Sequence, residues 1–191
     1  MKSFLIIIFI FTCFTIDGQN SYEFEANEQF PFGKLNPNAP KQVADFQQLI
    51  GRCECKSEKR NRDQTWAKPV KMIWTFKYIM NGTAIQDETL KEDGIHSGSI
   101  RQFSKDSLKW NVHYYSSGST PANLPSWEGV KKENGNIILY RKQKAPNGMD
   151  GYSRLTFHDI NEKGYKWKGE WVNEGETFVF PTWKISCVKV Q

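Results

Sequence analysis

The most regular feature of the chain is an alternation of apolar and polar residues that begins near Arg52 and continues almost to the last residue. In the segment 70–80 every even position carries Val, Met, Trp, Phe or Tyr, while the odd positions include Lys71, Thr75 and Lys77. A period of two places alternate side chains on opposite faces of a strand. The segment therefore predicts a strand with one apolar, strongly aromatic face.

A hairpin signal follows this strand directly. Asn81 and Gly82 both tolerate positive φ, which the tight turns of hairpins require. A return strand in "TAIQDETL" with a two-residue loop places Phe76 opposite Asp87 and Trp74 opposite Thr89. This register predicts that Asp87 lies among aromatic side chains on the inner face.

Further strand candidates recur at short intervals, separated by turn residues such as Asn134-Gly135 and Pro146-Asn147-Gly148. They occupy residues 98–104, 108–116, 127–133, 136–143, 151–160, 164–172 and 178–190. Many short strands with almost no helix favour an all-β barrel or sandwich. Because an open meander leaves two exposed edges, we predict a closed antiparallel up-and-down barrel of about 8–10 strands.

Two shorter regions precede the strands. Residues 19–40 contain three prolines and no sustained period, which indicates a flexible leader or a strap. In "KQVADFQQLIG" apolar residues recur at helical spacing, so a short helix ending at Gly51 is expected. The barrel domain then spans residues 41–191.

The first 18 residues indicate export. One lysine, an apolar run from Phe4 to about Phe14 and a polar end are typical of a cleaved secretory signal peptide. Lipoprotein anchoring at Cys13 is a minor alternative, because the residues before it match a lipidation motif poorly. The run is shorter than the roughly 20 apolar residues of a membrane-spanning helix. We therefore expect a secreted or periplasmic protein without a transmembrane segment.

Three cysteines remain after the signal peptide. Cys53 and Cys55 share one face of the first predicted strand, and Cys187 lies on the last. Barrel closure brings these strands together, so either early cysteine could form a disulfide with Cys187. Buried free thiols and a metal site are alternatives. Because structural zinc prefers four ligands in a C-x₂₋₄-C spacing, we expect no metal.

Charge narrows the classes of partner. The net charge is +5, and Lys alternates with Glu through most of the chain. Nucleic-acid-binding proteins gather basic residues on one face. The interspersed pattern is instead typical of a solvated surface, so a nucleic-acid partner is not expected.

Aromatic residues make up 14% of the chain, and many are in phase along their strands. Either they fill the barrel, or they line a pocket for one small apolar or amphipathic molecule. The candidate ligand-binding residues are Trp74, Phe76, Tyr78, Asp87, Arg101, Trp110, Tyr114, Trp167 and Trp171. We favour an exported small-molecule-binding barrel. A filled barrel that acts through its surface in the envelope or in stress remains an alternative.

Catalysis has less support. No GxSxG, HExxH or phosphate-loop motif is present. An isomerase or hydrolase would need Asp87 or His158 as a general base beside a cavity. The alternation leaves undecided whether Arg154 and His158, or Leu155 and Phe157, face inward. No cofactor is expected, since haem would require an inward histidine.

Three segments carry a resemblance to a known family. "ADFQQLIGRCECKSE", "MIWTFKYIMNGTAIQDE" and "SIRQFSKDSLKWNVHYYS" resemble the DUF1579-like, calycin-type barrels of secreted bacterial proteins. Gly82 matches the family's turn, and Arg101, Phe103 and Trp110 match its strand pair. Cys53 stands where lipocalin-like barrels usually carry Trp. The resemblance implies a lipocalin-like barrel whose wider group binds small hydrophobic molecules or haem, with a few enzymes.

Overall fold

The computed structural model describes residues 22–190, so the proposed signal peptide and Cys13 lie outside the described residues. The described part forms one 3₁₀-helix and ten strands. The elements are η1 (Lys41–Leu49), β1 (Gly51–Lys59), β2 (Val70–Ile79), β3 (Ala84–Lys91), β4 (His96–Ser104), β5 (Lys109–Ser116), β6 (Ser126–Lys131), β7 (Ile137–Lys142), β8 (Gly151–Asn161), β9 (Gly164–Asn173) and β10 (Val179–Lys189).

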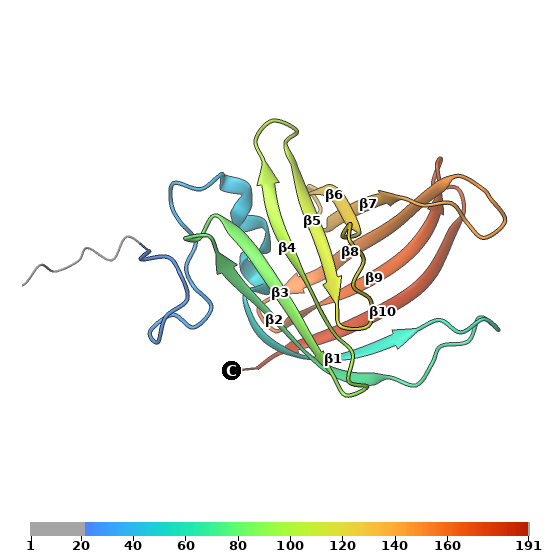
Figure 1. The fold of residues 1–191 in the computed structure, drawn as a ribbon, viewed down its shortest axis with the longest axis horizontal. Coiled ribbons are helices and arrows are strands. Elements are labelled where there is room, and N and C mark those ends of the chain that lie inside the picture. Colours follow the sequence, from blue (N-terminus) through green and yellow to red (C-terminus); the bar gives the residue numbers. More distant parts are fainter. Residues whose placement is uncertain (1–21, 191) are drawn as a thin grey trace, which may run out of the picture.

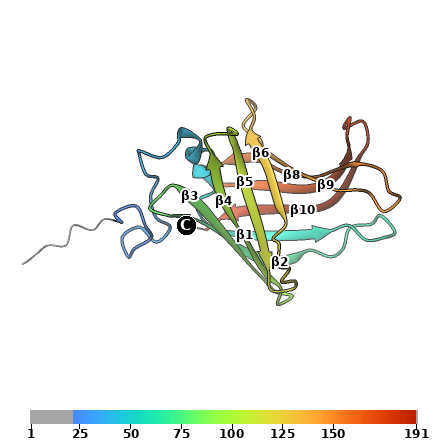
Figure 2. The same cartoon turned by 45° about the horizontal axis from the view of Figure 1, so that its top comes forward.

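Each strand pairs antiparallel with the next, and β10 pairs with β1 to close the barrel (Figures 1 and 2). The predicted closed up-and-down barrel is confirmed, and its architecture is consistent with a lipocalin-like fold. Closure removes both sheet edges, which would otherwise present unpaired backbone groups.

The β2–β3 hairpin has the predicted register. Phe76 pairs with Asp87, and Trp74 pairs with Thr89. The loop is longer than two residues, because the last ladder pair is Ile79 with Ala84. Gly82 has φ +76°, and a Cβ there would lie 2.3 Å from the Lys34 carbonyl oxygen. Glycine is therefore required at this position both by conformation and by space.

The expected helix is present as the 3₁₀-helix η1. Val43, Phe46 and Leu49 recur every third residue, which suits a helix of three residues per turn. All three side chains are fully buried. The Phe46 ring lies 4.9 Å from the Trp110 ring and 5.8 Å from the Phe157 ring. η1 therefore packs into one end of the barrel and closes it.

Residues 22–40, without helix or strand, lie against the turn end of the β2–β3 hairpin (Figure 1). The Tyr78 amide donates to the Phe32 carbonyl at 2.9 Å, and the Asn36 amide donates to the Gly82 carbonyl at 3.2 Å. The Phe24 amide donates to Asn81 Oδ1 at 3.1 Å. These bonds make residues 22–40 a strap across the end of the hairpin.

A disulfide joins the two strands of the barrel seam. Cys55 and Cys187 are register partners in β1 and β10, with their Cα atoms 4.1 Å apart, and their sulfur atoms are bonded. Cys53 is a buried free thiol. The structure thus identifies Cys55 as the partner of Cys187. The disulfide indicates an oxidising, extracytoplasmic compartment. No helix in the region 22–190 is long and apolar enough to cross a membrane.

The structure also decides the orientation of β8. Leu155 and Phe157 face the barrel interior, so Arg154 and His158, one residue out of phase, lie on the outer face. There Arg154 Nη2 pairs with Glu170 Oε2 of β9 at 2.9 Å. Alternation could not decide this point, because both faces of β8 carry apolar side chains.

Candidate functional site

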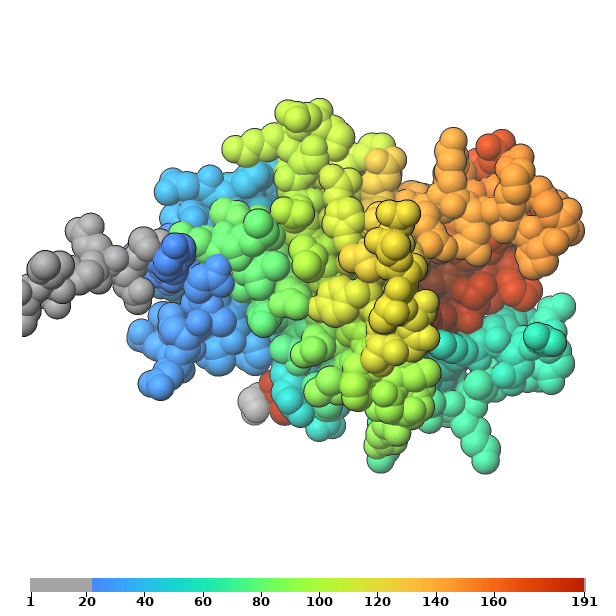
Figure 3. Space-filling view, viewed as in Figure 1, coloured from blue at the N-terminus to red at the C-terminus, as the bar shows by residue number. Residues whose placement is uncertain are grey.

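The barrel encloses a cavity of about 240 Å³. It lies beyond Phe157, against which Phe46 of η1 packs, and reaches the end of the barrel opposite to η1. At that end the space-filling surface is hollowed between the turquoise β1–β2 loop and the orange β7–β8 loop (Figure 3). We call this space, with the residues that line it, the interior cavity.

One wall of the interior cavity is polar and is formed by β3 and β4. Its members are Asp87, Thr89, Lys91, Ser97, Ser99 and Arg101. All six are buried, with between 2% and 8% of their surface exposed. They lie together because Asp87 pairs with Ser99 and Thr89 pairs with Ser97 across the two strands.

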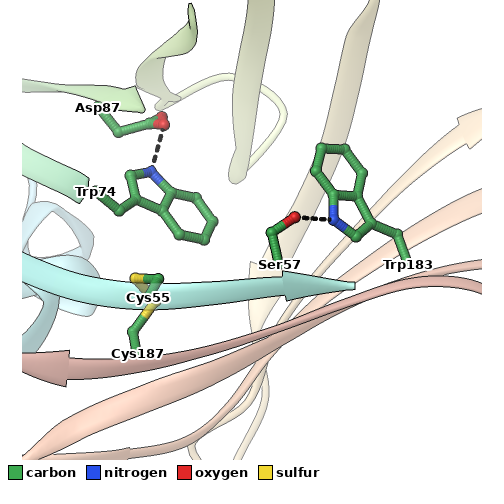
Figure 4. Close-up of a disulfide and its surroundings, with 6 residues drawn as sticks. All are labelled: Cys55, Ser57, Trp74, Asp87, Trp183 and Cys187. Carbon is green, nitrogen blue, oxygen red and sulfur yellow. Dashed lines mark hydrogen bonds between the residues drawn. A yellow bond between two sulfur atoms is a disulfide. The ribbon is translucent and has the colours of Figure 1, made fainter. Parts of the chain in front are cut away.

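Asp87 occupies the inner end of this polar wall. Its Oδ2 accepts a hydrogen bond from Trp74 Nε1 at 2.8 Å (Figure 4). Its Oδ1 accepts a hydrogen bond from Arg101 Nη1, and the two side chains form a buried ion pair. The Arg101 guanidinium also lies 4.9 Å from the centre of the Phe76 ring and 5.2 Å from that of Phe46. The pair therefore sits at the boundary between the aromatic core and the cavity.

The outer part of the polar wall carries hydroxyl groups and one amine. Thr89 Oγ1 lies 2.7 Å from Ser97 Oγ and donates to the Ser97 carbonyl at 3.1 Å. Lys91 Nζ pairs with Asp93 Oδ2 at 2.6 Å, and this ammonium holds the pKa of Asp93 below its usual range. The Lys91 charge is therefore already balanced.

The opposite wall is apolar and comes from β7 to β10. Its main members are Leu139, Leu155, Phe157, Trp167, Trp183 and Ile185. Two hydroxyls on this side are already hydrogen-bonded: Ser153 Oγ accepts from Trp127 Nε1 at 3.2 Å, and Thr182 Oγ1 donates to the Gly169 carbonyl at 2.9 Å.

Cationic side chains cover two of the aromatic rings that line the cavity. Arg141 lies 4.6 Å from the centre of the Trp127 ring, and Lys59 Nζ lies 4.9 Å from that of Trp183. Trp183 Nε1 donates to Ser57 Oγ at 2.8 Å (Figure 4). These contacts fix the indole rings and hold the wall in place.

The structure brings five of the nine candidate ligand-binding residues to the cavity and places four elsewhere. The five are Trp74, Asp87, Arg101, Tyr114 and Trp167. Phe76, Tyr78 and Trp110 are buried but do not line the cavity, and Trp110 Nε1 donates to Asp45 Oδ2 of η1 at 3.1 Å. Trp171 also does not line it, and its Nε1 donates to the Gln143 carbonyl at 2.9 Å.

Sequence reasoning missed most of the polar wall. Thr89 and Lys91 follow Asp87 at intervals of two, and Ser97 and Ser99 precede Arg101 in the same way. The signal was therefore present as polar residues in phase with two charged ones. It is weak, because serine and threonine are common on the exposed face of any strand.

Buried hydroxyls and a thiol surround the aromatic core near the plugged end. Burial raises the pKa of Tyr78 to about 12, and its hydroxyl has no hydrogen-bond partner among the described residues. Burial also raises the pKa of Tyr165 well above its usual value and raises that of the Cys53 thiol beside it. These groups are neutral at ordinary pH and lie outside the cavity lining.

The three histidines do not line the interior cavity. His158 lies on the outer face with its Nδ1 3.5 Å from Asp159 Oδ2, and His113 Nδ1 lies 2.7 Å from Ser126 Oγ on the outside of β5. His96 is exposed. The titratable side chains that line the cavity are Asp87, Lys91, Arg101 and Tyr114.

The fold and the site together define a closed up-and-down barrel with one two-sided interior cavity. No family model matches the sequence, and a search of the curated proteins finds no similar one. The cavity and its residues therefore carry the functional argument.

Proposed function

We propose that this protein is an exported binding protein that holds one small, partly apolar molecule inside its barrel, with Asp87 and Arg101 at the inner end of its polar wall. The observation that carries the proposal is the interior cavity of about 240 Å³, walled by Trp, Phe, Leu and Ile with a few polar groups. Such a composition is typical of small-molecule sites, which range over about 300–1,000 Å³ for drug-sized ligands. A smaller molecule is therefore favoured here.

Packing of the core supports a cavity over a fully filled barrel. Beneath η1 the aromatic rings are closely packed, and Phe76, Phe157 and Tyr165 lie within 6.1 Å of one another by ring centres. Beyond Phe157 the same barrel is open. Since a protein interior is normally packed without voids larger than a water molecule, a space of this size favours binding.

Export is part of the proposal and has its own test. The signal-like residues 1–18 and the Cys55–Cys187 disulfide both support it, as does the resemblance to DUF1579-like secreted barrels. When the full chain is expressed in a secreting bacterial host, we expect the intact mass of the product to correspond to a chain beginning at Gln19. A product that retains residues 1–18 would contradict cleavage, and a lipid mass on Cys13 would indicate anchoring instead.

Native mass spectrometry tests binding. The mature protein is measured intact and again after denaturation, and we expect a non-covalent adduct that is lost on denaturation. The variant Leu155→Trp fills the cavity and should lose the adduct. Leu90→Trp is the matched control, because Leu90 is 45% exposed and does not line the cavity.

An adduct that survives in Leu155→Trp would place binding outside the interior cavity. If the wild-type protein shows no adduct and extracts containing candidate ligands produce none, the barrel does not act as a binding protein. The outer surface would then be the remaining functional region.

A further inference from the structure

We infer that the ligand of the interior cavity is a neutral molecule with hydroxyl groups along one edge and an apolar face opposite. The inference rests on the proposed binding function and adds the chemical class of the ligand. It follows from how polar groups are distributed over the cavity walls.

The polar groups form a continuous stripe along the barrel instead of a cluster at one end. On β3 the stripe runs from Asp87 through Thr89 to Lys91, and on β4 from Arg101 to Ser97. Four residues of strand span about 13 Å. A bound molecule therefore meets polar atoms along its whole length on this side.

The other side of the cavity is apolar over the same length. In the closed order of ten strands, β8 and β9 lie directly across the barrel from β3 and β4. They contribute Leu155, Phe157 and Trp167 to the lining, and β10 adds Trp183. A molecule between these walls must be polar along one edge and apolar along the other.

The polar stripe has hydrogen-bonding capacity left for a ligand. Ser99 is 7% exposed and lines the cavity, and its hydroxyl makes no side-chain hydrogen bond within the described chain. A hydroxyl can donate once and accept twice. Asp87 accepts one bond on each oxygen from protein donors and retains further lone pairs. Ser99 and Asp87, which are register partners, can together bind neighbouring ligand hydroxyls.

The charged side chains that line the cavity are paired within the protein, which disfavours an ionic ligand. Arg101 is paired with Asp87, and Lys91 is paired with Asp93. An anion placed inside would have to compete with these carboxylates or remain unpaired, and an unpaired buried charge is strongly unfavourable. A neutral molecule has no such cost. The site thus differs from one built for a chain amphiphile, which needs a free charge at one end and apolar walls around the rest.

Three probes of different polarity test this inference by isothermal titration calorimetry on the mature protein: naphthalene, 2,7-dihydroxynaphthalene and octanoate. We expect the diol to bind at least about tenfold more tightly than naphthalene, since two hydrogen bonds of ordinary strength supply that factor. Octanoate should neither bind at comparable concentration nor displace the diol.

Ser99→Ala separates hydrogen bonding from cavity shape. This variant should lower the affinity for the diol by about five- to tenfold and leave the affinity for naphthalene unchanged. The control Ser186→Ala, on the exposed outer face of β10, should change neither affinity. Thermal unfolding of both variants verifies that they fold.

Equal affinity for naphthalene and the diol, competition by octanoate, or an unchanged diol affinity in Ser99→Ala would overturn the inference. The absence of binding by all three probes would also overturn it. In each case the adduct seen by native mass spectrometry decides separately whether the barrel binds any molecule, so the two proposals can fail independently.

Discussion

The Asp87 carboxylate accepts hydrogen bonds from two buried donors, Trp74 and Arg101. Only 2% of Asp87 and 3% of Arg101 is exposed. In so buried a position neither charge is tolerated alone, because the partner left behind would be buried without compensation. The pair therefore links the aromatic core to the polar wall of the interior cavity through charge as well as packing.

Removing one member of this pair should be strongly destabilising. We expect Asp87→Ala to lower the free energy of unfolding by about 3–5 kcal/mol, measured by urea denaturation. The double variant Asp87→Leu/Arg101→Met replaces both charges by apolar groups and should recover most of that loss. A double variant as unstable as Asp87→Ala would show that the shape of the pair, and not its charge balance, matters.

Because Tyr78 is buried, the stability of the protein should fall at alkaline pH. Burial raises its pKa to about 12, above the value of about 10 for the unfolded chain. The unfolded chain therefore loses its proton first, and the free energy of unfolding falls as the pH rises from about 10 to about 12. The loss attributable to a shift of this size is about 2–3 kcal/mol.

The Tyr78→Phe variant isolates this contribution. Below pH 10 it should be as stable as the wild type or more so, because the Tyr78 hydroxyl is buried without a partner among the described residues. Its free energy of unfolding should decline less steeply above pH 10. Parallel pH profiles for the two proteins would contradict the burial effect.

Among the elements, η1 closes one end of the barrel. Phe46→Ala removes a fully buried ring that contacts Trp110 and Phe157. We expect a loss of about 3–5 kcal/mol in the free energy of unfolding, as for other large-to-small core substitutions. Gln47→Ala, on the exposed side of the same helix, should change it by less than about 0.5 kcal/mol. If Phe46→Ala and Gln47→Ala lowered the free energy of unfolding equally, the loss would come from impaired helix formation and not from lost packing.

Strand positions and hairpin register were predictable because they depend on local patterns. Alternation and the Asn81-Gly82 turn predicted that Phe76 faces Asp87, and the structure confirms it. The sequence also predicted a helix over 41–51. It did not predict that the helix is a 3₁₀-helix, because the three-residue spacing of Val43, Phe46 and Leu49 is compatible with an α-helix as well.

The position of a residue along the barrel axis could not be predicted from the sequence. Period two assigns Trp74 and Tyr78 to the same inner face, yet Trp74 lines the cavity and Tyr78 lies in the core beyond it. The difference arises from η1, which fills one end only, and no pattern within β2 reveals which end that is. Trp110 is a second example. Its strand pattern predicted an inward side chain and hence a binding residue, but it did not show that Trp110 lies at the end where it packs against Phe46 of η1.

For the molecule as a whole, the seam disulfide should contribute substantially to stability. Cys55 and Cys187 are 132 residues apart, and closing so long a loop in the unfolded chain is worth on the order of 4–5 kcal/mol in the chain-entropy model. We expect the double variant Cys55→Ala/Cys187→Ala to lose a similar amount in urea denaturation.

Cys53→Ala is the matched control for that variant. Cys53 is buried on the same strand face but is not bonded, so its replacement should cost less than the loss of the disulfide. Equal losses would mean that packing of sulfur in the core, and not the covalent link, stabilises the seam.

The same disulfide links the first strand, β1, covalently to the last strand, β10, so the chain between Cys55 and Cys187 forms a covalently closed loop. A cut anywhere between the two cysteines then leaves both fragments attached. The loop between β5 and β6 is such a place, since residues 117–124 are all exposed. Protease nicking there would yield two chains on a reducing gel and one on a non-reducing gel. A single cut in this loop would therefore leave the walls of the interior cavity covalently joined.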